Sequence, residues 1–83
     1  MFTVYIIYSA KSDRYYVGYT ADISKRILEH NSGMNVSTSK ANDWAQQFTR
    51  VFESRAQAME FETFIKKKKS RKYIEWLINN LAD

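Results

Sequence analysis

Two tyrosines near the start of the chain are spaced so that their phenol groups can meet on one face of a β-hairpin. Val4 to Tyr8 and Tyr15 to Tyr19 are runs rich in β-branched and aromatic residues, and Ala10 to Asp13 separate them. Side chains alternate between the two faces of a strand, so a loop of two or four residues places Tyr5 and Tyr16 on one face, opposite or diagonal to each other. Phenol hydroxyls in such a position donate and accept hydrogen bonds and can transfer protons.

The same spacing also fits an ordinary aromatic cross-strand pair, and taken alone it favours that interpretation. Gly18 points the other way, because it lies inside the second aromatic run. A glycine weakens a strand and often marks a place where a ligand or another backbone comes close. The hairpin is therefore a candidate site as well as a structural element.

A helix predicted from Asp22 to about Asn31 adds a guanidinium and an imidazole. Arg26 and His30 are one turn apart on the flank of its apolar stripe, so both point toward the sheet edge. Considered singly, Arg26 fits a side chain that extends along apolar surface to reach water. His30 likewise fits a half-buried or capping imidazole near the helix C-terminus. Functional roles for the two depend on what lies beside them.

A later helix carries an acid at the margin of its buried side. The apolar stripe of this helix places Glu62 beside buried surface and Glu60 away from it; the stripe consists of Ala58, Phe61 and Ile65. A carboxylate in that position needs a partner, and either a divalent cation or Arg26 would serve. An Arg26–Glu62 ion pair or simple solvation is the alternative to a metal site.

Positive charge is concentrated late in the chain. The formal net charge is +4 and the isoelectric point is near 9.4. A polyanionic partner is one interpretation, and a solvated helix face that keeps a small protein soluble is the other. The basic run consists of Lys66, Lys67, Lys68, Lys69, Arg71 and Lys72.

The elements that must position these residues follow the order β-β-α-β-α-α. This order predicts an α+β fold with a small three-stranded, mostly antiparallel sheet flanked by helices, in a single domain over residues 1–83. Helix-capping residues are expected at Asp22, Ser54 and Ser70, and Gly33 follows the first helix where a left-handed residue is needed. Beyond the hairpin, the expected segments are a helix over 22–31, a loop over 34–43, a strand over 44–52, and helices over 54–68 and 70–81. Within this fold Trp44 and Trp76 both fit core positions, which leaves little support for an interaction module.

Composition excludes several classes of protein. The chain contains no cysteine, so a disulfide-stabilised secreted domain and a zinc finger are both disfavoured and a cytoplasmic protein is expected. The apolar start of the chain, eight residues from Met1 to Tyr8, is too short for a membrane span and lacks the basic segment of a signal peptide. We expect no membrane association and no small organic cofactor.

Taken together, these residues resemble a known family. The pattern Val4-Tyr5-Ile6-Ile7, then Tyr16-Val17-Gly18, then Arg26 and His30, then Glu62, resembles the GIY-YIG nuclease superfamily. The chain looks most like the short, stand-alone bacterial members, and it is also similar to the N-terminal nuclease domain of the bacterial excision-repair nuclease. The resemblance covers nearly the whole chain.

The resemblance implies a metal-dependent endonuclease that hydrolyses phosphodiester bonds in DNA, with DNA repair as its setting. In that case Glu62 would hold magnesium or manganese, Tyr16 would activate the attacking water, and Tyr5 would orient that water or a phosphate oxygen. Arg26 would stabilise charge on the phosphoryl group, and His30 would act as a general base or hydrogen-bonding partner. The residues expected to contact nucleic-acid phosphates are Lys66, Lys67, Lys69, Arg71 and Lys72.

The chain also departs from the family pattern. Thr3 and Val4 precede Tyr5 where the family name places a glycine. Tyr19 stands where some relatives carry a basic residue, and Ile74 stands where many carry an active-site asparagine. The last two departures imply thinner support for the transition state. They leave open an alternative function, a catalytically weak or inactive nucleic-acid-binding module of the same fold.

Overall fold

The computed structural model describes residues 1–81, and within them the expected order of elements is confirmed. The fold is α+β, with a three-stranded antiparallel sheet and three α-helices. A short 3₁₀ helix, absent from the predicted order, interrupts the segment between the first helix and the last strand. The elements are β1 (Phe2–Ser9), β2 (Arg14–Thr20), α1 (Ile23–Asn31), η1 (Val36–Thr38), β3 (Ala45–Phe52), α2 (Arg55–Lys68) and α3 (Arg71–Leu81).

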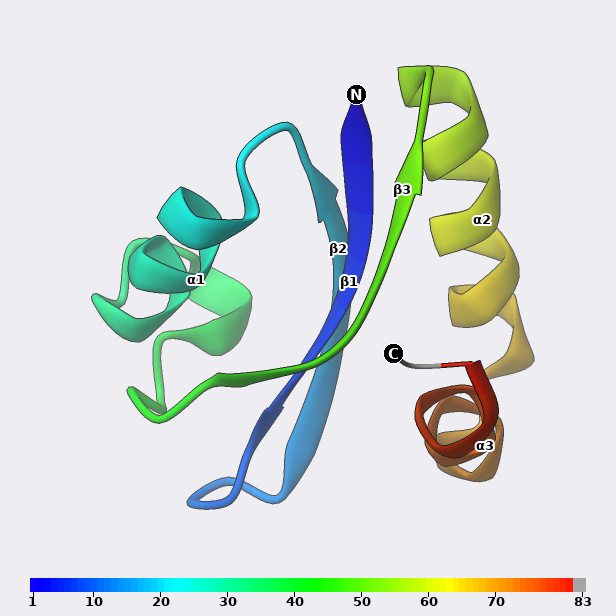
Figure 1. Cartoon of the computed structure of the whole chain (residues 1–83). Coiled ribbons are helices and arrows are strands. Elements are labelled where there is room, and N and C mark those ends of the chain that lie inside the picture. The colour runs from blue at the N-terminus through cyan, green and yellow to red at the C-terminus, as the bar shows by residue number, and fades with distance from the viewer. Residues whose placement is uncertain (82–83) are drawn as a thin grey trace.

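The sheet lies between two layers of helix. Its strand order is β2-β1-β3, so β1 is the central strand and β2 is one of the two edges. In Figure 1, α1 covers one face of the sheet, while α2 and α3 lie against the other. None of the helices in residues 1–81 has both the length and the apolarity that a membrane span requires.

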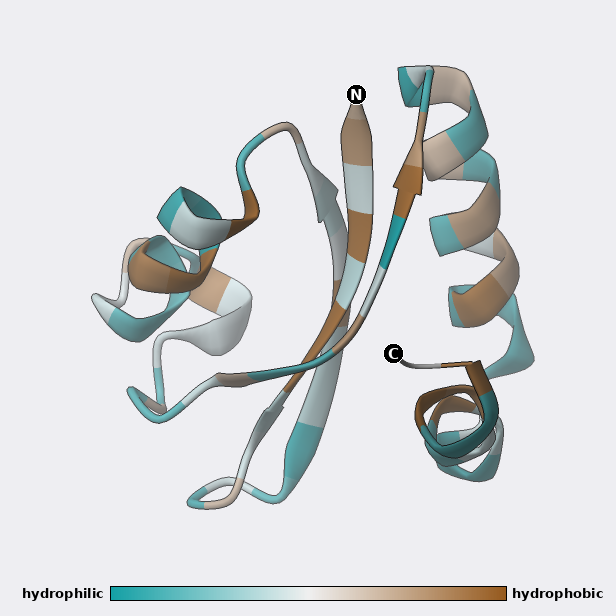
Figure 2. Ribbon diagram, in the orientation of Figure 1, coloured by the Kyte–Doolittle hydropathy of each residue, from teal (hydrophilic) through white to brown (hydrophobic). Residues whose placement is uncertain are grey.

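The alternation of side chains along β1 divides the core into two clusters. Val4 and Ile6 pack with Ile65 and Leu77 on the side of α2 and α3. Tyr5 and Ile7 face the other way, in the cluster on the side of α1. Figure 2 shows the hydrophobic residues alternating with paler ones along this strand. Burial of these apolar side chains is the main favourable term in folding, and it fixes the face on which each tyrosine lies.

The hairpin between β1 and β2 has the predicted loop parity. Ser9 pairs with Arg14, which leaves a loop of four residues. Tyr5 pairs with Gly18, and Tyr16 pairs with Ile7, so the two tyrosines are diagonal neighbours on one face. Their ring centroids are 6.3 Å apart. The prediction that the two phenols share a face is confirmed.

A β-bulge in β3 explains an irregular stretch of the sequence. Ile6 pairs with Phe48, but the next residue, Ile7, pairs with Gln46, so Gln47 is an extra residue in the ladder. The two glutamines interrupt the alternation expected of a strand because the strand itself is interrupted there. The strand begins at Ala45, one residue later than predicted.

The predicted helix ends are confirmed in detail. Asp22, Ser54 and Ser70 each accept a hydrogen bond from the backbone N–H three residues further on. Gly33 has φ +81°, as expected for the residue that follows α1. At the end of α2, Lys69 adopts the left-handed conformation with φ +47°, which lets the chain turn into α3.

Two expectations about the core are corrected. Trp44 is 5% exposed and belongs to the core, but Trp76 is 52% exposed and stacks on Tyr73. The apolar stripe of α3 is wider than its contact with the sheet, so its outer edge faces solvent. The segment predicted as loop contains η1, and it buries Thr38 and Ala41 against the α1 side of the sheet.

Candidate functional site

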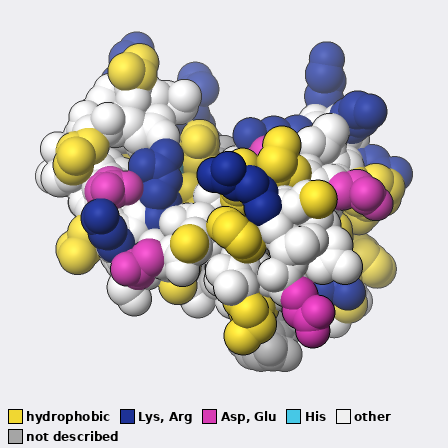
Figure 3. All heavy atoms as spheres, turned by 90° about the horizontal axis from the view of Figure 1, so that it is seen from above, with side chains coloured by type: hydrophobic (Ala, Val, Ile, Leu, Met, Phe, Trp, Pro, Cys, Tyr) yellow, Lys and Arg dark blue, Asp and Glu magenta, His cyan; other side chains and the backbone are white. Residues whose placement is uncertain are grey.

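Four of the five residues predicted to act together line one pocket. This cavity, which we call the Tyr5 pocket, has a volume of about 430 Å³. Residues from both faces of the sheet line it, so it lies at the open edge formed by β2. Figure 3, seen from above, shows Lys and Arg side chains across the middle of this face of the molecule, beside hydrophobic ones. The polar and signature residues of the Tyr5 pocket are Tyr5, Tyr16, Gly18, Arg26, Arg55 and Glu62.

Gly18 makes room for Tyr5. A Cβ atom on Gly18 would lie 2.6 Å from the Tyr5 hydroxyl oxygen, 2.7 Å from its Cζ, and 3.1 Å from Cε1 of Tyr16. The sequence indicated a close approach by a ligand or by another backbone at this glycine. The structure shows that the ring of the paired tyrosine makes the close approach, and this places the Tyr5 hydroxyl over the β2 strand.

His30 lies behind Tyr5, outside the pocket lining. It is 0% exposed, with Nε2 2.8 Å from the Tyr5 hydroxyl and Nδ1 2.7 Å from Thr38 Oγ1. The Thr38 hydroxyl donates to the backbone oxygen of Asn35 at 3.4 Å, so it accepts the hydrogen bond from Nδ1–H of His30. This assigns the ring proton to Nδ1 and leaves Nε2 to accept a hydrogen bond from the Tyr5 hydroxyl.

Burial keeps both members of this pair uncharged at neutral pH. Desolvation, with a smaller contribution from the nearby Arg26 charge, lowers the pKa of His30 to about 4. Desolvation also raises the pKa of Tyr5 to about 12, although Arg26 partly offsets this by favouring the phenolate. Tyr5 is therefore a hydroxyl, and His30 is a neutral acceptor with its lone pair directed at that hydroxyl.

Tyr16 differs from Tyr5 in having an uncommitted hydroxyl. Its ring centroid is 4.8 Å from that of His30, and Lys66 Nζ is 5.9 Å from it on the Tyr16 side. Among residues 1–81, the Tyr16 hydroxyl forms no hydrogen bond with another side chain or with the backbone. It is free to bind a water molecule or a phosphate oxygen in the pocket.

The two charged groups of the pocket each pair within their own helix. Arg26 Nη1 donates to Glu29 Oε1 at 3.0 Å, and Glu62 Oε1 is 3.5 Å from Lys66 Nζ. The Arg26–Glu62 ion pair that was one alternative for these residues does not form. The Glu62 side chain is 16% exposed, and Arg26 still has four N–H donors beyond the one bound to Glu29. Both groups can therefore interact with a ligand in the pocket.

The basic run predicted to contact phosphates divides among several surfaces. Lys66, Lys69 and Arg71 line a second cavity next to Tyr16, whereas Lys67 lines a cavity beside Phe64 on another side of α2. Lys72 is exposed on α3. The helical turn between Lys67 and Lys69 sends neighbouring lysines in different directions, so they cannot act as one patch.

Arg71 has partners of its own. It forms ion pairs with Asp13 at 2.7 Å and with Glu75 at 3.3 Å, and its guanidinium lies over the ring of Tyr15. These contacts join α3 to the hairpin loop. They also neutralise a charge that was expected to bind nucleic acid.

Sequence reasoning missed two residues at the site. Arg55 lines the Tyr5 pocket, and its spacing of seven from Glu62 places both on one face of α2, a signal that was present in the sequence. Thr38 orients His30 from a segment expected to be plain loop. No local pattern marks Thr38, because its role depends on a contact between η1 and α1.

The family known as the GIY-YIG catalytic domain matches residues 1–74 of this chain. The chain belongs to this family. Membership supports a nuclease role and implies a nucleic-acid partner. The two strands that bear the GIY-YIG signature are β1 and β2, whose tyrosines meet in the Tyr5 pocket.

Several GIY-YIG relatives are known as UPF0213 proteins. The chain is similar to the UPF0213 protein of Streptococcus pneumoniae, with 31% identity over 75 residues that cover 89% of this chain and 76% of the relative. It is 34% identical to the one from Halobacterium salinarum over 67 residues, which cover 80% and 86%. The solution NMR structure of a UPF0213 protein from Bacillus halodurans matches with a TM-score of 0.62 and 32% identity, covering 99% of this chain and 87% of that one.

The two departures from the GIY-YIG pattern have distinct places in the structure. Tyr19 lines the Tyr5 pocket, and the guanidinium of Arg55 lies 5.9 Å from the centroid of its ring. A cation is thus present beside Tyr19, although it comes from α2. Ile74 lines the second cavity, where it adds apolar surface.

Proposed function

We propose that this protein is a metal-dependent endonuclease that hydrolyses phosphodiester bonds in DNA. The observation that carries the proposal is the convergence of Tyr5, Tyr16, Arg26 and Glu62 on one pocket, from four separate elements. Phosphodiester hydrolysis needs an oriented water, a cation near the phosphate and a group that removes a proton. The pocket offers a residue type suited to each of these tasks.

Glu62 fits a role as the protein ligand of magnesium or manganese. Among the described residues, no group of three or more His, Cys, Asp or Glu side chains is arranged to hold a metal ion. A single carboxylate suits magnesium, which keeps several waters and is commonly bound by one or two carboxylates together with substrate phosphates. Such a cation would polarise the scissile phosphate and the leaving oxygen.

Arg26 is suited to binding the phosphoryl group. Its guanidinium is held by Glu29 through one nitrogen, which fixes its direction and leaves other N–H groups for phosphate oxygens. Arg55, on α2, offers a second guanidinium in the same pocket. The two arginines would hold a phosphate from the sides of α1 and α2.

The tyrosines divide the handling of water between them. Tyr5 donates its proton to His30, so its oxygen can accept a hydrogen bond from water and orient that water. Tyr16, whose hydroxyl is uncommitted, would activate the attacking water. The low pKa of His30 keeps Nε2 available as an acceptor, so a proton passed to Tyr5 can move on to His30.

The test is a cleavage assay with magnesium or manganese on a panel of single-stranded, duplex and branched DNA and RNA. We expect Glu62→Gln to lower the rate by about 100-fold or more, the loss typical of removing one group that stabilises charge in a transition state. Glu60→Gln is the matched control, because Glu60 lies on the same helix but lines other cavities. Equal rates for the two folded variants would refute the role of Glu62.

Tyr16→Phe tests the hydrolytic mechanism. It keeps the ring and removes only a hydroxyl that has no partner among residues 1–81, so folding should be unaffected while cleavage falls. The second candidate function is a binding module without catalysis, favoured by Tyr19 and Ile74 at positions where relatives carry a basic residue and asparagine. A parent protein that binds DNA but cuts no member of the panel would support that module instead.

A further inference from the structure

A second cavity continues from the Tyr5 pocket along β2. It has a volume of about 470 Å³, within the range of about 300–1,000 Å³ seen for small-ligand sites. Tyr16 lines both cavities and forms the boundary between them. We call this cavity the Lys69 groove; its main lining residues are Arg14, Tyr16, Lys66, Lys69, Ser70 and Ile74.

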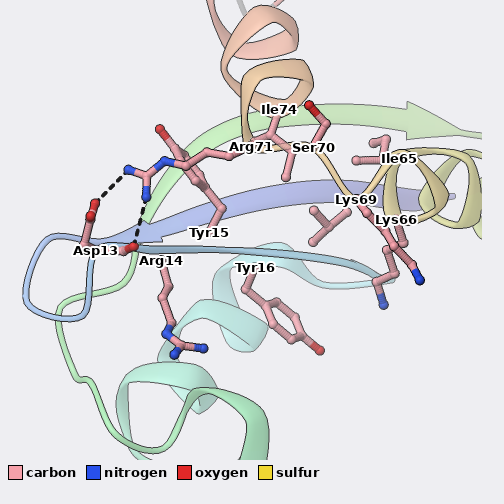
Figure 4. Close-up of a pocket in the computed structure, with 11 residues that line it drawn as sticks. Asp13, Arg14, Tyr15, Tyr16, Ile65, Lys66, Lys69, Ser70, Arg71 and Ile74 are labelled. Atoms are coloured by element: carbon pink, nitrogen blue, oxygen red, sulfur yellow. Dashed lines mark hydrogen bonds and ion pairs between the residues drawn. The ribbon is translucent and has the colours of Figure 1, made fainter.

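The rim of the groove carries an excess of positive charge. Arg14 and Lys69 form no ion pair with any residue in 1–81, and Lys66 has only the 3.5 Å contact with Glu62. At the far end, Arg71 is neutralised by Asp13, and Figure 4 shows that pair across the groove from Lys66 and Lys69. The uncompensated charge therefore lies toward the Tyr5 pocket, where it favours an anion.

The inner wall of the groove is apolar. Val17 and Ile65 are buried core residues that present an edge to the cavity, and Ile74 and Tyr15 add further apolar surface. Cations at the rim and a flat apolar wall behind them match the two parts of a nucleotide. Phosphates bind lysine and arginine, and bases stack on aromatic or apolar side chains.

Lys66 connects the groove to the reacting group. Its Nζ lies 3.5 Å from Glu62 Oε1 and 5.9 Å from the centroid of the Tyr16 ring, so it stands between the two cavities. A strand with one phosphate at Glu62 and Arg26 can continue past Tyr16 without leaving positively charged surface. The Arg71–Asp13 pair limits how far it follows this path.

We propose that the Lys69 groove binds the nucleotide next to the cleaved phosphate, on the same strand. Its phosphate lies at Lys66 and Lys69, and its base lies against Tyr16 and Ile74. This inference rests on the proposed function, because it takes the Tyr5 pocket as the place of cleavage. It assigns Arg14, Lys69 and Ile74 to substrate binding and leaves Arg71 as a structural residue.

The first test measures binding without cleavage, with a fluorescent oligothymidylate in EDTA, both single-stranded and annealed to its complement. Lys69→Gly removes the charge and suits the backbone, since φ at Lys69 is +47°. We expect weaker binding and a salt dependence reduced by about one unit of slope in log K against log salt. Lys67→Ala, which removes the same charge from another side of α2, should retain the parent slope. Equal slopes for the two variants would overturn the proposal.

The second test locates the base. In NMR spectra of the parent protein, the oligothymidylate should shift the methyl signals of Val17 and Ile74, and leave Met59, which lines a different cavity, unchanged. Shifts confined to Met59 and its neighbours would overturn the assignment. Both tests are run without metal, so a parent that binds here but never cuts disproves the proposed function and not the binding site. A parent that binds no oligonucleotide disproves both.

Discussion

The Tyr5 hydroxyl lies 2.8 Å from Nε2 of His30, and neither group is accessible to solvent through its own surface. This hydrogen bond joins the central strand to α1, and Thr38 extends it to η1. The orientation of the Tyr5 oxygen in the pocket is thus set by a residue that does not line the pocket. His30 is a positioning residue for Tyr5.

Replacing His30 by leucine should destabilise the protein by at least about 1–3 kcal/mol, the cost of leaving a buried polar group without its partner. Both the Tyr5 hydroxyl and the Thr38 hydroxyl would lose their hydrogen bond to the ring. Urea unfolding monitored by tryptophan fluorescence gives the free energy of unfolding. Glu29→Gln, which changes the exposed side of the same helix, should cost less than His30→Leu; the reverse order would contradict the positioning role of His30.

Stability should fall as the pH drops from about 6.5 to about 4. The pKa of His30 is about 4 in the folded protein against an ordinary value of 6.5, so in this interval the unfolded chain binds the proton and the folded protein does not. The free energy of unfolding therefore rises with pH across the interval, and this contribution is constant below it. Urea unfolding at several pH values measures the slope.

The same pH series on His30→Gln provides the control. Glutamine cannot titrate, so the slope between about pH 4 and 6.5 should decrease. The carboxyl groups of Asp13 and Asp43 do not obscure the result, because their hydrogen bonds to Arg71 and Ser9 hold their pKa values below the ordinary 3.8. An unchanged slope in the variant would show that His30 is not the responsible group.

Gly18→Ala should destabilise the protein by about 1–3 kcal/mol, the usual cost of adding a methyl group to a packed site. The new Cβ would lie 2.6 Å from the Tyr5 hydroxyl oxygen, and the bond to His30 prevents the ring from moving away. NMR signals of His30 should shift as the ring is displaced. Unfolding in urea gives the stability change.

Gly33→Ala separates packing from general loss of stability. Nothing lies within 4 Å of a Cβ at Gly33, but its φ of +81° is strained for alanine. This variant should also lose stability, yet leave the His30 signals in place. If the two variants shift those signals equally, then Gly18 has no special relation to Tyr5.

Asp13→Asn tests whether Arg71 is structural. Asparagine tolerates the φ of 52° at this position and removes only the charge that pairs with Arg71. We expect a slightly lower melting temperature together with tighter binding of an oligonucleotide, since Arg71 would be released. Calorimetry and fluorescence anisotropy measure the two effects, and weaker binding would count against the release of Arg71.

Local periodicity was sufficient to predict much of the candidate site. The two-residue period of a strand and the parity of the loop place Tyr5 and Tyr16 on one face, whatever the rest of the chain does. The 100° step of a helix likewise separates Glu62 from Glu60. Helix caps depend on residues three apart, so Asp22, Ser54 and Ser70 could be identified directly.

Pairing between distant segments could not be predicted in this way. A helical wheel shows that Arg26 and Glu62 both face the sheet edge, but only distances decided that each pairs within its own helix. Trp76 fits a core stripe, yet no element in residues 1–81 covers it. Arg71 belongs to a basic run in sequence and to an ion pair with the hairpin in space.

The sequence by itself determined which side chains share a face, because the geometry of a strand or a helix repeats every few residues. The tertiary structure alone decided their chemical state. His30 is neutral because α1, η1 and β1 enclose it together, and that enclosure is made by residues up to 33 positions apart, from Tyr5 to Thr38. Desolvation depends on all neighbours in space, and no short segment of the chain specifies them.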